Sequence, residues 1–148
     1  PHDRAPRGRN AGRGRAPRSR RLTVAAASPT LEGAHVRLEP LALAHVAPLC
    51  AVGLDPELWR WTIQRVRDAD EMRRYVERAL AERDRGASIP FAIVERASGR
   101  VVGSTRLMNL EPAHRRAEIG STWLAPAWQR TALNTEAKLL LLAHAFDA

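Results

Sequence analysis

The chain alternates between two hydrophobic periodicities, which predict short strands and helices in a definite order. Residues 35–40 alternate apolar and polar side chains, which predicts a strand that ends at its proline. Residues 43–52 have apolar side chains at helical spacing with Pro48 inside the pattern, so we expect a short or bent helix. Residues 56–61 are typical of a single helical turn.

The most regular helical pattern follows Asp68. This residue is a preferred N-cap, and Glu71 three positions later completes a capping-box pattern. Gly86 predicts the end of the helix, because glycine adopts the left-handed conformation that terminates helices. The apolar positions between them form a single stripe, made of Met72, Tyr75, Val76, Ala79 and Leu80.

The period then changes from that of a helix to that of a strand. Residues 91–95 form an apolar run of strand length, residues 97–100 are typical of a turn, and residues 101–107 predict the return strand of an antiparallel hairpin. One face of the return strand is expected to carry Val101, Gly103, Thr105 and Leu107.

Residues 117–124 predict one more strand, which Pro126 closes. Regular alternation would place one set of side chains on one face, namely Ala117, Ile119, Ser121 and Trp123. The opposite face would carry Glu118, Gly120 and Thr122.

The last predicted helix starts at Asn134 or Thr135 and runs to Phe146. Its leucine run, residues 139–142, makes it apolar nearly all round, so we expect it to be buried on more than one side. The order of elements predicts an α/β (α+β) fold with a mixed, mainly antiparallel sheet flanked by helices. Leu80, Ile93 and Leu140 are expected to pack together in one core.

Composition excludes several classes of protein. The apolar share is 45% and the charged share 27%, but no run of about 18 apolar residues occurs, so we expect no transmembrane helix and no membrane partner. Cys50 is the single cysteine and cannot form an intramolecular disulfide, which favours a reducing, cytoplasmic compartment. No group of Cys and His has zinc-ligand spacing, so no metal site is predicted.

The net charge of +8 belongs mostly to the beginning of the chain. Residues 1–28 contain eight Arg and one Asp, whereas residues 29–148 contain 16 basic and 15 acidic side chains. The Arg/Gly-rich run 7–15 has no apolar side chain larger than alanine, so residues 1–28 are predicted to be a disordered extension, dispensable for the fold. Such a segment is either an unstructured leader or a binder of nucleic acid through phosphate contacts and stacking.

One segment has the arrangement of an anion site. A predicted strand ends at Leu124, residues 125–133 form a loop, and a helix begins after it. The first turn of a helix presents unpaired backbone N–H groups and partial positive charge, which suit a phosphate or pyrophosphate. Arg130 adds a full charge at the same place. A plain helix cap with a solvated arginine remains the alternative.

Three stretches of the chain resemble the GNAT acetyltransferase superfamily, in family order. These are residues 31–40 (LEGAHVRLEP), residues 117–126 (AEIGSTWLAP) and residues 134–146 (NTEAKLLLLAHAF). The likeness covers about residues 29–148. Within the superfamily, these stretches most resemble the RimJ/RimL-like branch of protein N-acetyltransferases. The resemblance implies a GNAT N-acetyltransferase domain that transfers an acetyl group from acetyl-CoA to an amine, either a protein N-terminus or a small molecule.

The resemblance also implies a cofactor site. The family binds the pyrophosphate of acetyl-CoA with a Gln/Arg-x-x-Gly-x-Gly/Ala loop, and residues 129–134 (QRTALN) occupy that frame. Gln129 matches, whereas Ala132 and Asn134 stand where glycine-like residues are usual. The resemblance implies that the backbone of Trp123 and Leu124, at the end of the strand, would form hydrogen bonds with the pantetheine amides. The implied cofactor-binding residues are Trp123, Leu124, Gln129, Arg130, Thr131, Ala132, Leu133, Asn134 and Thr135.

Glu118 is the implied catalytic residue, because relatives often place a glutamate base on this strand. A solvated carboxylate, or an ion pair with Arg115 or Arg116, is the alternative. His114 and His144 are weaker candidates; His144 is more typical of a packing or capping residue. Trp59 and Trp61 would line either an acceptor groove or the core.

In the family, the last helix is followed by another strand, a helix that carries the residue protonating the leaving thiolate, and closing strands. The sequence is therefore expected to be a GNAT domain truncated before its C-terminal third. A catalytically weak GNAT-like protein whose basic tail binds nucleic acid is one alternative. An unrelated α/β protein that binds a nucleotide at residues 129–134 is another. The oligomeric state and the identity of the acceptor stay open.

Overall fold

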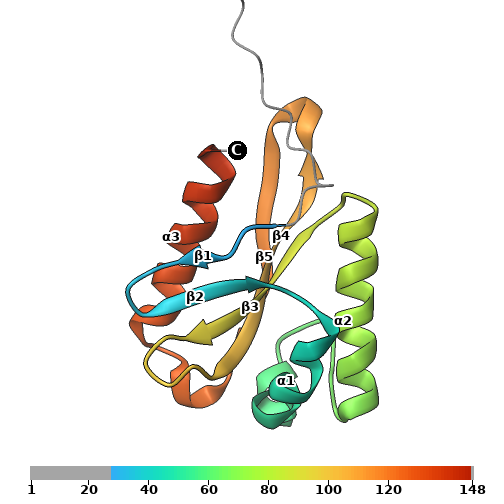
Figure 1. The fold of residues 1–148 in the computed structure, drawn as a ribbon. Helices are drawn as coiled ribbons and strands as arrows, with labels where there is room; N and C mark the ends of the chain where they lie inside the picture. The colour runs from blue at the N-terminus through green and yellow to red at the C-terminus, as the bar shows by residue number, and fades with distance from the viewer. Residues whose placement is uncertain (1–27, 148) are drawn as a thin grey trace, which may run out of the picture.

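The computed structural model describes residues 28–147, and its centre is one antiparallel sheet with the strand order β1-β2-β3-β4-β5 (Figure 1). The predicted extension therefore lies outside the described residues, except for Ser28. The predicted hairpin is confirmed as β3 and β4, with Phe91 opposite Thr105. The strands are β1 (Leu31–Glu32), β2 (Val36–Pro40), β3 (Ile89–Glu95), β4 (Val101–Glu111) and β5 (Arg116–Leu124).

Helices cover both faces of this sheet. Helices α1 and α2 pack on one face and α3 packs on the other, as Figure 1 shows. The α-helices are α1 (Val46–Gly53), α2 (Ala69–Asp84) and α3 (Ala132–Asp147). Four short 3-10 helices connect elements: η1 (Leu43–His45), η2 (Pro56–Trp59), η3 (Pro112–His114) and η4 (Pro126–Trp128). The fold is the predicted α/β arrangement of a mainly antiparallel sheet flanked by helices.

Helix α2 begins and ends at the predicted residues. The Asp68 carboxylate accepts a hydrogen bond from the Glu71 N–H at 2.8 Å. The Glu71 carboxylate bonds the Arg67 N–H rather than that of Asp68, so the capping box is closed one residue earlier than its usual form. Gly86 has a φ of 73°, and the Ala87 N–H reaches the Glu82 carbonyl at 2.9 Å, which completes a Schellman ending.

The proline inside the first helical pattern lies in the first turn of a short helix. Residues 43–45 form η1, and α1 begins only at Val46, so Pro48 is its third residue. An N–H at this position has no acceptor within an α-helix, so the missing donor of proline costs nothing there.

The core consists of two clusters separated by the sheet. The cluster on the α3 side contains Ile93, and Leu140 packs at its margin. The cluster on the α1 and α2 side contains Val76, and Leu80 packs at its margin. The expectation that Leu80, Ile93 and Leu140 pack together is therefore wrong for Leu80, because the sheet lies between α2 and α3.

Two of the three register shifts in the described sheet overturn the predicted alternation of faces. The register shifts in β4, opposite Ile93 and Val94, so Val101 packs toward α2 whereas Leu107 packs toward α3. A second shift lies between β4 and β5, where Ser121 has a φ of 47°. An extra residue inverts the alternation beyond it. Ile119 and Trp123 consequently lie on opposite faces.

Helix α3 also departs from its prediction. It begins at Ala132, before Asn134 and Thr135. Only one of its faces is buried, since Leu141 is inaccessible whereas Leu139 is 60% and Phe146 85% exposed. The leucine run therefore forms both a core face and an exposed apolar face.

Within residues 28–147, no helix is long and apolar enough to cross a membrane. The same residues contain no group of three or more His, Cys, Asp or Glu side chains that could hold a metal ion.

Candidate functional site

The connection from β5 to α3 is a tight, internally bonded turn. After Leu124 the chain enters η4, and Gln129 returns its side-chain Nε2 to the Leu124 carbonyl at 2.9 Å. The Thr131 hydroxyl donates to the Trp128 carbonyl at 2.7 Å and accepts from the Leu133 N–H at 3.4 Å. Thr131 therefore caps α3, which explains why the helix starts three residues earlier than Asn134 would have started it.

Arg130 sits at the apex of this turn in an unfavourable backbone conformation. Its φ is 59°, in the left-handed region that a residue with a Cβ rarely adopts. Its side chain is exposed, with no carboxylate within ion-pair distance among the described residues. Residues held in this way cluster at functional sites. The turn thus places an unneutralised cation beside the beginning of α3.

The first turn of α3 supplies backbone donors. In any α-helix the first N–H groups have no helical acceptor, and among residues 28–147 the one partner found is the Thr131 hydroxyl, which accepts from the Leu133 N–H. The N–H groups of Ala132 and Asn134 thus point out of the helix end that carries the positive dipole. The Leu133 side chain is buried in the core, and Thr135 is exposed. The Asn134 Oδ1 is buried and has no hydrogen-bond partner among the described residues.

The two predicted residues at the end of β5 serve the core with their side chains. Trp123 is 5% exposed, and its ring lies 5.3 Å from that of Trp59. Leu124 is 6% exposed on the opposite face. Their backbone is more available, because β5 is an edge strand of the described sheet and pairs only with β4. Any contact with a ligand would therefore come from the outer edge of β5.

Glu118 lies farther back along β5, on the face that α2 covers. It pairs with Met108, two positions from Arg106, whose side chain reaches Glu82 of α2. Glu118 is exposed and accepts a hydrogen bond from the Asn109 Nδ2 at 2.9 Å. Arg116 bonds Glu111 rather than Glu118. At ~3.3 Å per residue, Glu118 lies roughly 20 Å along the strand from Leu124.

The weaker candidates do not join this site. His114 is exposed in η3, and the His144 ring packs edge-on against Phe91 at 6.5 Å, which is a packing role. Trp59 is buried and donates its Nε1 to the Gly53 carbonyl at 2.7 Å. Trp61, in contrast, is 86% exposed.

Sequence reasoning missed the part that Glu136 plays at the start of α3. Its carboxylate accepts hydrogen bonds from the N–H groups of Ala34, His35 and Val36, each at 2.7 Å. Burial raises the pKa of Glu136, but the three donors outweigh it and hold that pKa below its ordinary value. A Cβ at Gly33 would come within 2.4 Å of this side chain. The helix is thus fastened to the β1–β2 turn, about 100 residues away in the sequence.

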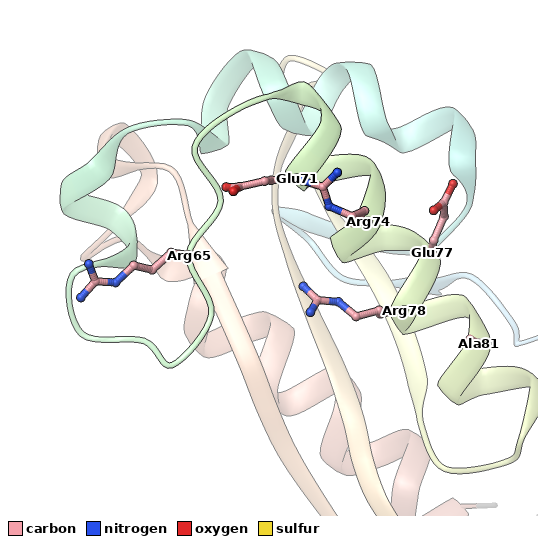
Figure 2. Close-up of a pocket in the computed structure, with 6 residues that line it drawn as sticks. All are labelled: Arg65, Glu71, Arg74, Glu77, Arg78 and Ala81. Carbon is pink, nitrogen blue, oxygen red and sulfur yellow. The ribbon is translucent and has the colours of Figure 1, made fainter.

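A surface pocket of about 480 Å³ lies away from the α3 terminus, between α2 and the segment before it (Figure 2). Its lining contains Arg65, Glu71, Arg74, Glu77, Arg78 and Ala81. The arginines at positions 74 and 78 have the i, i+4 spacing of one helix face, which is the signal that sequence reasoning could have used.

Comparison with known proteins assigns the class of this domain. Residues 35–148 match the family model described as "Acetyltransferase (GNAT) domain", so the chain belongs to the GNAT acetyltransferase family. Among curated proteins, none matches the chain significantly.

Solved structures agree with this assignment. A GCN5-related N-acetyltransferase from Brucella melitensis is 30% identical, with a TM-score of 0.73 over 81% of this chain and 55% of that protein. The acetyltransferase from Salmonella typhimurium that modifies the N-terminal serine of ribosomal protein L7/L12 is 19% identical, with a TM-score of 0.67 over 78% of this chain and 67% of that one. At that identity the likeness concerns the fold alone.

A structure of RimL, described as a ribosomal L7/L12 α-N-protein acetyltransferase, contains coenzyme A. It is 20% identical, with a TM-score of 0.66 over 78% of this chain and 67% of that one, which again shows the fold alone. For three of the matched structures, this chain spans 55–62% of their length.

Proposed function

We propose that the chain is an acetyl-CoA-dependent N-acetyltransferase domain of the RimJ/RimL-like kind, with an amine at a protein N-terminus as acceptor. Membership of the GNAT family supports acyl transfer from an acyl-CoA. The observation that carries the proposal is the β5–α3 turn, where outward N–H groups, a helix N-terminus and the unneutralised Arg130 meet. A cytoplasmic location stays a prediction based on the single cysteine.

The residues at the turn fit the pyrophosphate of coenzyme A. The N–H groups of Ala132 and Asn134 supply donors, and Arg130 supplies charge. Ala132 is exposed and small, so its Cβ leaves the approach to the backbone open. Gln129, through its bond to Leu124, keeps the turn closed rather than reaching outward. Thr131 and Leu133 act by shaping the helix start, and Thr135 stands exposed beside it.

The outer edge of β5 suits the pantetheine arm. The backbone groups of β5 that face away from β4 are available for ladder-like hydrogen bonds with the two amides of that arm, except the Leu124 carbonyl, which already accepts from the Gln129 side chain. The bulge at Ser121 turns the strand at this point. An extended arm would run along β5 toward Glu118.

Glu118 is proposed as the base. Attack on a thioester carbonyl requires an amine without its extra proton, and a carboxylate can take that proton directly or through water. Glu118 is exposed, is held by Asn109, and is not neutralised by Arg116. The amine nitrogen forms the C–N bond of the new amide, and the C–S bond of the thioester breaks. The proton that Glu118 takes from the amine balances the negative charge of the thiolate that leaves.

The proposed cofactor site is tested by calorimetric titration of the full chain with acetyl-CoA. Ala132→Asp places a carboxylate against the phosphates and should abolish measurable binding, whereas Arg130→Ala should weaken binding by ~1–3 kcal/mol. Arg85→Ala, which removes an exposed arginine at the far end of α2, is the matched control and should bind like the wild type. Equal affinity of Ala132→Asp and wild type would place the phosphate site elsewhere.

A further inference from the structure

Large exposed apolar side chains gather in two places within the described residues. One is the outer face of α3, and the other is the segment 60–67 between η2 and α2. In that segment Ile63 is fully exposed and Trp61 is 86% exposed. Exposed apolar side chains beside each other on a surface mark interaction sites more often than isolated ones do.

The segment 60–67 is held in place from both ends. Trp59 and Val66 are 4% and 2% exposed in the cluster under α1 and α2. Between them the Thr62 hydroxyl reaches the carbonyls of Trp59 and Gln64, at 3.1 and 2.5 Å. Trp59 and Val66 therefore anchor the segment at both ends. Trp61 and Ile63 are exposed although the segment that carries them is held in a defined conformation.

The pocket beside this segment has unneutralised positive charge. Arg74 and Arg78 extend from α2 toward the segment that carries Arg65 (Figure 2). Among the described residues, none of these three arginines has a carboxylate within ion-pair distance.

The two carboxylates that line the pocket already have partners. Both oxygens of Glu71 accept hydrogen bonds from Arg67, the shortest being 2.6 Å, from Nη2 to Oε1. Glu77 faces Arg73 at 3.8 Å. The pocket thus presents three arginines whose charges are available to a ligand.

We infer that this surface, formed by Trp61, Ile63, Arg65, Arg74 and Arg78, binds an acidic peptide segment of the acceptor protein. Guanidinium groups recognise carboxylates bidentately, and an apolar side chain between the acids would lie against Trp61 and Ile63. Glu118 lies on the same side of the sheet as α2. The inference rests on the proposed function, because it assigns the peptide that follows the acceptor amine.

The local character of the charge favours a peptide over a nucleic acid. Residues 29–148 are nearly neutral, with 16 basic and 15 acidic side chains, so an excess of only one basic side chain is present to track a phosphate backbone. Ile63 offers a branched aliphatic surface, which suits leucine or valine rather than a stacked base.

The experiment measures binding of a fluorescent peptide of alternating Glu and Leu to the full chain by anisotropy. Arg74→Ala/Arg78→Ala should weaken binding about tenfold, and Trp61→Ala should weaken it by a similar factor. The matched control for charge is Arg83→Ala/Arg85→Ala, which removes two arginines at the far end of the same helix that do not line the pocket. The matched control for apolar area is Leu139→Ala, on the opposite side of the sheet.

Comparison ligands decide between occupants. A peptide with Lys in place of Glu should bind more weakly than the acidic peptide, and single-stranded polyuridine RNA is the second comparison ligand. Because the arginine-rich residues 1–28 can bind RNA by themselves, the RNA result is read from the variant. A larger loss of RNA binding than of peptide binding in Arg74→Ala/Arg78→Ala, or equal losses in the control variants, would overturn the inference. The titrations contain no acetyl-CoA, and acetyl-CoA binding by Arg74→Ala/Arg78→Ala should equal that of the wild type. Failure of the peptide to bind while acetyl-CoA still binds would refute this surface and leave the proposed cofactor site standing.

Discussion

Single side chains at the start of α3 join parts of the chain that are distant in sequence. Glu136 spans from the helix to three consecutive N–H groups of the β1–β2 turn, and Gly33 leaves the space that its carboxylate fills. The donors lower the pKa of Glu136 although its partial burial acts in the other direction. The same helix start holds the proposed pyrophosphate site, so the position of that site depends on this carboxylate.

Replacing Glu136 by Gln should therefore reduce stability in a pH-dependent way. An amide has one acceptor oxygen and turns N–H donors toward N–H donors, so at neutral pH we expect a loss of roughly 1–2 kcal/mol, discounted for partial exposure. Because the pKa is lowered in the folded protein, this contribution is complete above the ordinary glutamate pKa near 4.5 and declines as the pH falls through the lower, folded value. Urea unfolding of both proteins across acidic pH measures the difference.

The control for this charge is Glu57→Gln, which changes an exposed glutamate paired only with Arg60. Its unfolding free energy should follow that of the wild type at every pH. A constant difference between Glu136→Gln and wild type from neutral to strongly acidic pH would show that the three hydrogen bonds do not depend on the charge.

At the scale of elements, local signals predicted the structure where a single residue decides it. Asp68 and Gly86 specify the ends of α2 through their own caps, and the turn at residues 97–100 specifies the β3–β4 hairpin. The two bulges could not be predicted from the sequence. The order of apolar and polar residues is compatible both with regular alternation and with an inserted residue that reverses the two faces of the strand. The positive φ of Ser121 lies where the register between β4 and β5 shifts, so it belongs to the pairing of the two strands rather than to a local sequence signal.

The candidate site was predictable to a different degree. The strand, loop and helix order located the turn, but Thr131 rather than Asn134 caps α3 because its hydroxyl reaches Leu133. No pattern in the sequence pairs Glu136 with the β1–β2 turn, since that contact depends on how α3 crosses the sheet. The hydrophobicity of α3 also led to the wrong prediction that the helix is buried on more than one side. The sheet covers only one side of α3, so the other face remains exposed.

The faces of α3 should differ strongly in their response to truncation. Leu141→Ala removes an inaccessible side chain from the cluster beside Phe91 and Ile93 and should cost about 2–5 kcal/mol. Leu139→Ala makes the same change two positions away, at a side chain that is 60% exposed, and should cost no more than about 0.5 kcal/mol. Chemical denaturation measures both. Similar losses at the two positions would mean that the outer face of α3 is also covered in solution.

At the scale of the whole molecule, the sheet separates two cores that serve different parts of the proposed chemistry. The cluster under α3 supports the helix whose N-terminus faces the proposed pyrophosphate. The cluster under α1 and α2 anchors Trp59 and Val66, and through them the segment proposed to hold the acceptor. Only the backbone of the sheet is common to both clusters. Each side can therefore be altered while the other keeps its packing.

This separation predicts additive energetics across the sheet and coupled energetics on one side of it. Ile93→Val, in the α3 cluster, and Val76→Ala, in the α2 cluster, should each cost about 0.5–3 kcal/mol, and their double variant should equal the sum within ~0.5 kcal/mol. Trp59→Phe and Trp123→Phe alter two rings that lie 5.3 Å apart, so their double variant should depart from the sum by about 0.5–1.5 kcal/mol. Equilibrium unfolding of the six variants and the wild type gives both cycles. Coupling across the sheet as large as that between the two tryptophans would mean that the clusters act as one core through the strands, and the two proposed sites could then not be altered independently.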